Sequence, residues 1–201
     1  MRKNLVLASA SPRRRELLSN IGLDFTVVPG NIDEPLLDGL APWVQAEALA
    51  LAKARFVARQ LSDSVVLGAD TIVVLDGQIL GKPADESGAR AMLQFLQGRE
   101  HVVHTGVALV DATKGRELTA SESTRVRFGR LDRLDIDWYV STGEPMDKAG
   151  AYGVQGLGSM FIEGINGCYF NVVGLPLRRV ALMLKEFGID PFFDRSAAHG
   201  R

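Results

Sequence analysis

The stretch from Leu5 to Leu18, LVLASASPRRRELL, predicts a short strand that passes within a few residues into a helix. Leu5 to Leu7 are apolar, as in a buried strand. Ser11 suits the N-cap of the helix, and Pro12 suits its first position, where the missing N–H leaves no hydrogen bond unmade. A strand that leads directly into a helix favours folds in which helices pack on a sheet.

Three arginines, Arg13 to Arg15, occupy the first turn of this predicted helix. The positive end of the helix dipole disfavours a cation there by about 0.3–1 kcal/mol. An anion bound by the backbone N–H groups and the arginines would resolve this conflict, and phosphate is the usual anion at a helix N-terminus. The alternative is a solvated basic turn whose side chains point away. The spacing favours the phosphate site.

Further strands and helices alternate along the chain. Apolar runs predict strands at 25–28, 65–75, 79–80, 102–110 and 119–128, with a hairpin turn at Asp76-Gly77. Helical patterns cover 42–61, 85–97, 135–140 and 176–188, and loops with one or two strands are expected at 150–174. This mixture predicts an α/β fold with a mixed, twisted β-sheet flanked by helices. We expect one domain of two lobes over residues 1–195 and a disordered tail at 196–201.

The composition argues against several classes of partner. The 201 residues carry a net charge of −1, so the chain has no general basic field for nucleic acid, and any phosphate site must be local. No apolar segment is long enough to span a bilayer. Cys168 is the only cysteine, which excludes an intrachain disulfide and fits a reducing compartment. We therefore expect a cytoplasmic protein.

Two charged residues stand in apolar surroundings. Asp70 lies in VVLGADTIVVL, where every other residue except Thr71 is apolar or glycine. A buried carboxylate needs a partner, the sheet edge or a metal, and a structural cap on a loop is the alternative to a functional site. Lys53 is the only charge on its face of the predicted 42–61 helix. The alternative to a functional role is that its apolar stem packs on the protein while its ammonium group stays solvated.

Lys82 and Glu34 could join this pair. The hairpin ladder, carried on from the turn, would place Lys82 opposite Thr71, although the proline after Lys82 ends the ladder. Glu34 lies in a turn, where an acid is usually only solvated. Beside Asp70 it could supply a second oxygen ligand for Mg²⁺ or Mn²⁺, which take one or two carboxylates together with substrate phosphates.

Several motifs occur in a fixed order along the chain. They are Ser9 to Arg14, Glu34, Lys53, GADT at 68–71, LGKP at 80–83, HTGV at 104–107, KAGAYGVQG at 148–156 and FIEGINGCYFNVVGLP at 161–176. In these motifs the chain resembles the Maf family, whose members are nucleoside triphosphate pyrophosphatases, and the resemblance covers the chain from Leu5 to about Pro191.

The resemblance implies a fold related to the inosine triphosphate pyrophosphatases, with a cleft between two lobes. It also implies a homodimer and metal-assisted hydrolysis of a nucleoside triphosphate to the monophosphate and pyrophosphate. Asp70 matches the proton acceptor, although it could equally be a metal ligand with Glu34. The other residues that match the site are Ser9, Ser11, Arg14, Lys53 and Lys82.

Three further residues, Arg13, Thr71 and Gln155, resemble the members that prefer dTTP and UTP. The branch that cleaves 7-methyl-GTP carries a bulky aromatic, a glutamine and a glutamate at the matching places. Gln155 can both donate and accept a hydrogen bond, and so can match the O4 and N3–H edge of uracil or thymine. The alternatives are a 7-methyl-GTP-type pyrophosphatase, a nucleotidyl transferase, and a nucleotide-binding regulator of cell division without turnover.

Overall fold

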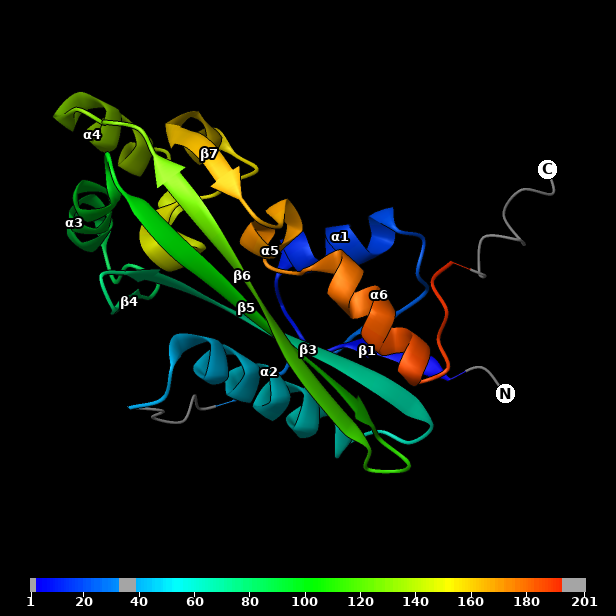
Figure 1. Cartoon of the computed structure of the whole chain (residues 1–201). Helices are drawn as coiled ribbons and strands as arrows, with labels where there is room; N and C mark the ends of the chain where they lie inside the picture. The colour runs from blue at the N-terminus through cyan, green and yellow to red at the C-terminus, as the bar shows by residue number, and fades with distance from the viewer. Residues whose placement is uncertain (1–2, 33–38, 193–201) are drawn as a thin grey trace. The chain divides into compact units, whose positions relative to one another are not determined.

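The structure is a computed structural model that describes residues 3–32 and 39–192 (Figure 1). In these ranges seven strands form one sheet in the order β2-β1-β3-β5-β6-β7, with β4 paired to β3. β1 pairs in parallel with β2 and β3, whereas β3–β4 and β6–β7 are antiparallel. The sheet is therefore mixed, and the helices flank it, which confirms the predicted fold class.

The strands are β1 (Asn4–Leu7), β2 (Thr26–Val27), β3 (Ser64–Leu75), β4 (Gln78–Leu80), β5 (Glu100–Asp111), β6 (Glu117–Phe128) and β7 (Ile162–Asn166). The α-helices are α1 (Pro12–Asn20), α2 (Pro42–Ala58), α3 (Glu86–Leu96), α4 (Arg133–Ser141), α5 (Tyr169–Val173) and α6 (Leu177–Glu186). Three short 3₁₀ helices complete the described elements, η1 (Glu144–Asp147), η2 (Ala149–Ala151) and η3 (Leu157–Phe161).

Several local predictions are confirmed. Ser11 caps α1, where its side chain accepts a hydrogen bond from the Arg14 N–H, and Pro12 is the first helical residue. The Asp76-Gly77 turn pairs Leu75 with Gln78, and both turn residues have positive φ, at 50° and 77°. This backbone geometry is typical of the tight hairpin turns that Asp-Gly favours.

Residues 150–174 differ from the prediction in their helical content. One strand, β7, lies there as expected, but η2, η3 and α5 occupy most of the remaining described segment. These helices have three to five residues each, which is too short to show the 3.6-residue periodicity on which a helix prediction depends. The glycines of the segment also lower its apparent helix propensity.

Contacts between residues divide the described chain into two compact units. The first contains the chain up to Asp70, Thr105–Glu122 and the chain from Gly174, and the second contains Thr71–His104 and Ser123–Val173. The predicted end of the domain at 195 and the predicted tail at 196–201 lie outside the described residues. In the described ranges no helix has both the length and the apolarity needed to cross a membrane.

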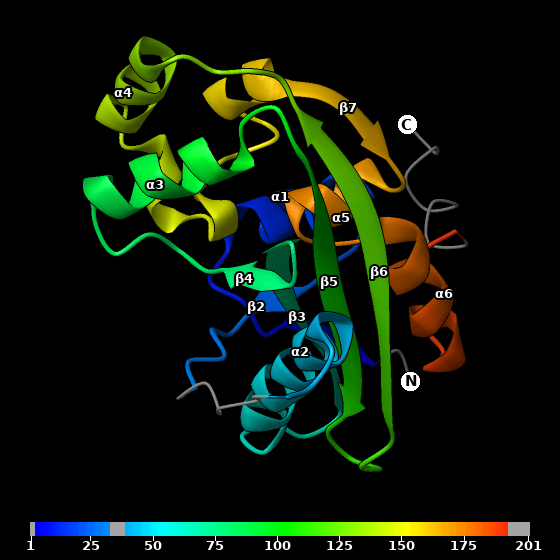
Figure 2. The same ribbon diagram turned by 60° about the vertical axis from the view of Figure 1, so that its left-hand side comes forward.

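One hydrophobic cluster of the first unit is built from small side chains of α2 and of the strands beneath it. Figures 1 and 2 show α2 along one face of β3 and β5, with α6 on the other side of the strands. Ala and Val predominate in this contact, so the helix axis approaches the sheet closely. The buried residues of this cluster are Val6, Ala8, Ala50, Ala54, Val57, Ala58, Val66, Ala108 and Val110.

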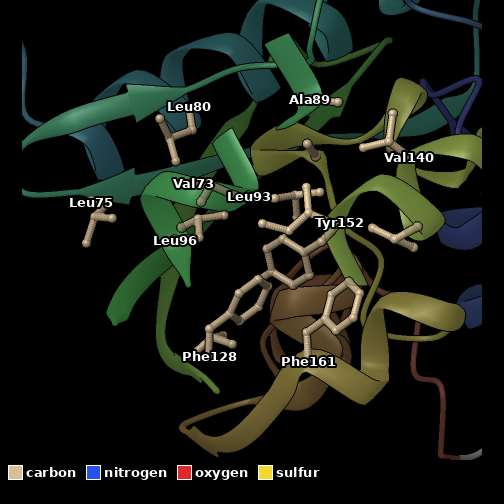
Figure 3. Close-up of a cluster of buried hydrophobic side chains, with 14 of the residues drawn as sticks. Val73, Leu75, Leu80, Ala89, Leu93, Leu96, Phe128, Val140, Tyr152 and Phe161 are labelled. Atoms are coloured by element: carbon tan, nitrogen blue, oxygen red, sulfur yellow. The ribbon is translucent and has the colours of Figure 1, made fainter. Parts of the chain in front are cut away.

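A hydrophobic cluster of the second unit contains aromatic rings. Figure 3 shows Phe128, Tyr152 and Phe161 gathered beside Leu93 and Leu96 of α3. The Phe128 and Tyr152 rings meet edge to face with their centroids 4.7 Å apart, an arrangement that aromatic pairs prefer. Helices α3 and α4 contact each other in this unit.

Candidate functional site

The turn between β1 and α1 is held by hydrogen bonds among its own polar residues. Ser9 is 7% exposed, and its Oγ accepts hydrogen bonds from Arg14 Nη1 and from the Ser11 N–H, each at 3.2 Å. Arg14 Nε also donates to the carbonyl oxygen of Gly174 at 2.8 Å. The Arg14 guanidinium is therefore fixed beside the first turn of α1, while Arg13 is half-buried on the same turn.

Lys53 and Asp70, the two charged residues predicted in apolar surroundings, meet each other. Lys53 Nζ donates to Asp70 Oδ1 at 2.5 Å, and the two side chains are only 16% and 14% exposed. Lys53 comes from α2 and Asp70 from the middle of β3. A largely buried carboxylate thus has a cationic partner, as its burial requires.

Gly68 explains why this pair can form. A Cβ atom at Gly68 would overlap the carbonyl oxygen of Ala50 on α2, so only glycine permits the observed approach of helix and strand. Because side chains alternate along a strand, Asp70 lies on the same face as Gly68. One helical turn beyond Ala50, Lys53 reaches that carboxylate. Gly106 on β5 makes a similar approach to α2 at Ala46.

The opening turn and the buried pair also interact electrostatically. Burial lowers the pKa of the Arg14 guanidinium below its usual value, the negative charge of Asp70 opposes this change, and the positive charge of Arg13 adds to it. The carboxylate of Asp70 is thus close enough to influence Arg14. Within the first unit, a helix N-terminus, two arginines, a lysine and a carboxylate share one environment.

The remaining predicted residues that the structure describes belong to the second unit. Thr71 is half-buried on β3, Lys82 is exposed after β4, and Gln155 is exposed in the bend between η2 and η3. The antiparallel pairing of β3 with β4 ends at Val73 and Leu80, so Lys82 lies beyond the ladder. Glu34 lies outside the described residues.

Hard oxygen ligands for a divalent metal are few at this site. No group of three or more His, Cys, Asp or Glu side chains within residues 3–32 and 39–192 is placed to hold a metal ion. Asp70 offers one carboxylate. Because Mg²⁺ or Mn²⁺ in nucleotide enzymes binds through one or two carboxylates together with substrate phosphates, a single carboxylate fits such an ion.

Two structural features of the site were missed by the sequence reasoning. The first is Gly68, whose glycine was visible in the GADT motif but whose contact with α2 depends on how the helix packs. The second is the carboxylate of Glu144, which accepts hydrogen bonds from the backbone of the loop that carries Gln155. The dense glycines at 150–158 were the available signal for a close backbone approach.

Comparisons with known proteins place these residues in a family. Residues 4–187 match the family described as Maf-like protein. A dTTP/UTP pyrophosphatase of Moorella thermoacetica is 56% identical over 186 residues, which are 92% of this chain and 96% of that protein. A protein of the same name from Symbiobacterium thermophilum is 53% identical over 190 residues, or 94% of this chain and 97% of that protein.

A third relative with this name, from Clostridium botulinum, is 46% identical over 194 residues, which are 94% of this chain and 99% of that protein. Among solved structures, the Ham1 protein of Staphylococcus aureus aligns with a TM-score of 0.45 and 14% identity. The alignment covers 63% of this chain and 72% of that one.

Proposed function

The chain belongs to the Maf family, and from this premise we propose that it hydrolyses dTTP and UTP to the nucleoside monophosphate and pyrophosphate. The observation that carries the proposal is the identity of 46–56%, over more than nine-tenths of the chain, to relatives named dTTP/UTP pyrophosphatase. The buried Lys53–Asp70 pair beside a basic helix start supports the same chemistry, because it joins phosphate-binding cations to a carboxylate.

The cationic residues hold the triphosphate in this proposal. Arg14 is already fixed by Ser9 and Gly174, so its guanidinium loses little conformational freedom when it binds an anion. The Ser11 hydroxyl, which accepts a hydrogen bond from the Arg14 N–H, can donate its own proton to a phosphate oxygen. Lys53 and Lys82 supply further positive charge against the negative charge that develops on the leaving pyrophosphate.

Hydrolysis proceeds by attack of a water oxygen on the α-phosphorus. A bond forms between this oxygen and phosphorus, the bond from the α-phosphorus to the bridging oxygen breaks, and pyrophosphate leaves. Asp70 either accepts the proton of the water or is a metal ligand that orients it. A divalent metal held by Asp70 and Glu34 would neutralise phosphate charge and acidify bound water.

Base recognition is assigned to Arg13, Thr71 and Gln155. The exposed amide of Gln155 can accept from N3–H and donate to O4 of uracil or thymine. These two bases differ by one methyl group, which is worth only about 1–3 kcal/mol in a pocket, so both dTTP and UTP are substrates. Cytosine exchanges both hydrogen-bonding groups of that edge, so the Gln155 amide must turn over to match it, and we expect CTP to be cleaved more slowly.

The test is incubation of the purified chain and Mg²⁺ with dTTP, UTP, CTP, GTP and 7-methyl-GTP, with detection of pyrophosphate and of the monophosphate. We expect the two products in equal amounts, fastest from dTTP and UTP. Faster cleavage of 7-methyl-GTP would contradict the assigned substrates. Nucleotide binding without products would favour the regulator, and pyrophosphate without free monophosphate would favour a transferase.

Two expectations about the cellular form follow from the family resemblance and from the single cysteine. The chain is proposed to act as a homodimer in the cytoplasm. Light scattering on the purified protein would then give twice the chain mass of 21.8 kDa. A mass equal to one chain at micromolar concentration would contradict the dimer and leave the proposed reaction intact.

A further inference from the structure

The carboxylate of Glu144 is surrounded by hydrogen-bond donors. Oε1 accepts from the Tyr139 hydroxyl at 2.9 Å and from the Gly158 N–H at 3.1 Å, and Oε2 accepts from the Leu157 N–H at 2.9 Å. The Tyr139 hydroxyl in turn accepts from the Gly153 N–H at 3.1 Å. All five residues belong to the second unit.

These hydrogen bonds hold both sides of one loop, Gly153–Gly158, which we call the Gln155 loop. Gly153 is tied to Tyr139 on one side of Gln155, and Leu157 and Gly158 are tied to Glu144 on the other. Tyr139 is fully buried in the aromatic core, so it is a rigid support. Gln155 itself is exposed, and the backbone on both sides of it is held by these hydrogen bonds.

The glycines of the loop are required because neighbouring side chains approach the backbone closely, and not because of a positive φ. A Cβ at Gly156 would overlap Glu144 Oε2, and a Cβ at Gly158 would lie 2.6 Å from the Tyr139 hydroxyl oxygen. Gly156 has φ of −103°, which is outside the left-handed region that favours glycine. The Gln155 loop is therefore shaped to wrap around this one carboxylate.

The charge of Glu144 suits this arrangement. Burial raises the pKa of its carboxyl, but the N–H groups of Leu157 and Gly158, the Tyr139 hydroxyl and the charge of Lys148 outweigh burial and hold the pKa below its usual value. An ionised carboxylate is acceptor-only, which matches three donors. A glutamine side chain has the same size, but its NH₂ group would face one of these donors and could not accept a hydrogen bond from it.

We propose that Glu144 and Tyr139 are positioning residues for base recognition, because they fix the loop that presents Gln155. This inference rests on the proposed function, in which Gln155 contacts the uracil or thymine edge. A loop ordered in advance pays less conformational entropy when the base binds, and a fixed amide discriminates between hydrogen-bonding edges. Glu144 and Tyr139 themselves act only through the Gln155 loop.

The test compares Glu144→Gln with the wild type and with Glu163→Gln. Glu163 is exposed on β7 in the same unit and is paired with Arg127 at 3.1 Å, so it is a matched control. We expect Glu144→Gln to raise KM for UTP by about tenfold with little change in kcat, and to lower the ratio of kcat/KM for UTP over CTP by a similar factor. In Glu144→Gln the amide hydrogens of Leu157 and Gly158 should also exchange faster. Glu163→Gln should change neither the kinetics nor the hydrogen exchange.

A second variant approaches the same contact from the other side. Gly156→Ala keeps Glu144 but displaces the loop from it, and we expect the same loss of UTP preference. It also keeps the proposal testable if Glu144→Gln does not fold. The double variant should be little worse than either single variant, because both changes remove one shared contact.

The outcomes separate this proposal from the proposed function. An equal loss of activity on UTP and CTP would indicate a general structural role and overturn the positioning role. An unchanged preference for UTP over CTP would also overturn it. If the wild type itself fails to cleave UTP and dTTP, the proposed function fails. If the wild type cleaves them and both variants keep its substrate preference, only the present proposal fails.

Discussion

The Lys53–Asp70 pair and the Gln155 loop are built in different ways. The pair stands on the regular elements α2 and β3, which Gly68 brings together, and its two side chains contact each other directly. Gln155 stands on a bend between two 3₁₀ helices, and its backbone is held by a carboxylate and a tyrosine from elsewhere in the unit. A site on regular elements keeps reacting groups in fixed geometry. A loop held at its ends can instead change the preferred substrate through substitutions that leave the regular elements in place.

Changes at the two places should therefore have different kinetic effects. Altering the Lys53–Asp70 pair should slow every nucleoside triphosphate alike, because the phosphates are common to all substrates. Altering the Gln155 loop should change which base is preferred.

The largest effect is expected from Lys53→Met. Methionine keeps much of the length of lysine but removes the ammonium from a carboxylate that is only 14% exposed. We expect kcat to fall by about 10²–10³-fold, as when one charge-stabilising donor is removed from an active site. The ratio of UTP to CTP cleavage should stay unchanged. Lys114→Met, at the exposed turn after β5, is the matched control. A changed base preference in Lys53→Met would contradict the claim that the pair acts on all nucleoside triphosphates alike.

A pH effect on stability is expected in the second unit. His101 is buried beside Phe128 and Tyr152, and its Nε2 lies 2.8 Å from the Tyr152 hydroxyl oxygen. Burial lowers the pKa of His101 from 6.5 to about 4. Below pH 6.5 the unfolded chain therefore takes up a proton that the folded chain does not. Stability should fall by about 3 kcal/mol as the pH drops from 6.5 to 4.

Urea unfolding measured across this pH range would check the His101 effect. His101→Gln should lose the part of the slope that His101 contributes, and a smaller slope should remain because burial also lowers the pKa of His104. An unchanged slope in the variant would assign the acid sensitivity to other groups.

A smaller loss of stability is expected from Gly68→Ala. The added methyl group must displace α2 from β3, and overpacking of this kind costs about 1–3 kcal/mol. Activity should fall on all substrates, because displacement of α2 moves Lys53 away from Asp70. Gly164→Ala on β7, where an added Cβ meets nothing within 4 Å, is the control and should match the wild type in thermal unfolding. Equal thermal stability and activity of the two variants would contradict the claim that close packing at Gly68 allows the Lys53–Asp70 pair to form.

The smallest effect is expected from Gln155→Ala. Loss of hydrogen bonds to the base should lower the preference for UTP over CTP by about tenfold and leave kcat for CTP nearly unchanged. Gln94→Ala, on the exposed side of α3, serves as the control in competition assays with both nucleotides. A uniform fall in rate on both substrates would place Gln155 in the phosphate chemistry instead.

Part of this organisation could be predicted because it is local or because a residue contradicts its surroundings. The N-cap Ser11 and the Asp76-Gly77 turn depend on a few neighbouring residues, and the structure confirms both. Asp70 and Lys53 attracted attention because a charge in an apolar strand or helix face needs a partner. Their pairing with each other was not predicted, since it depends on how closely α2 packs on β3.

The support of the Gln155 loop could not be predicted for a similar reason. Glu144 precedes Leu157 by thirteen residues, and a single glutamate before a proline has no distinguishing pattern. The short helices at 149–161 show no periodicity that would reveal how they fold around it. The glycines at 153, 156 and 158 were visible, but what they approach is known only from the tertiary structure.

The most direct test of the central claim is the turnover of UTP by Asp70→Asn beside the wild type, with pyrophosphate and UMP quantified together. Asparagine keeps the size of Asp70 and removes its charge; Asp137→Asn, at the Arg90 ion pair, controls for loss of an acidic side chain. We predict equal amounts of both products from the wild type and the control, and a rate at least about 10²-fold lower for Asp70→Asn. Near-normal turnover by Asp70→Asn would contradict the account.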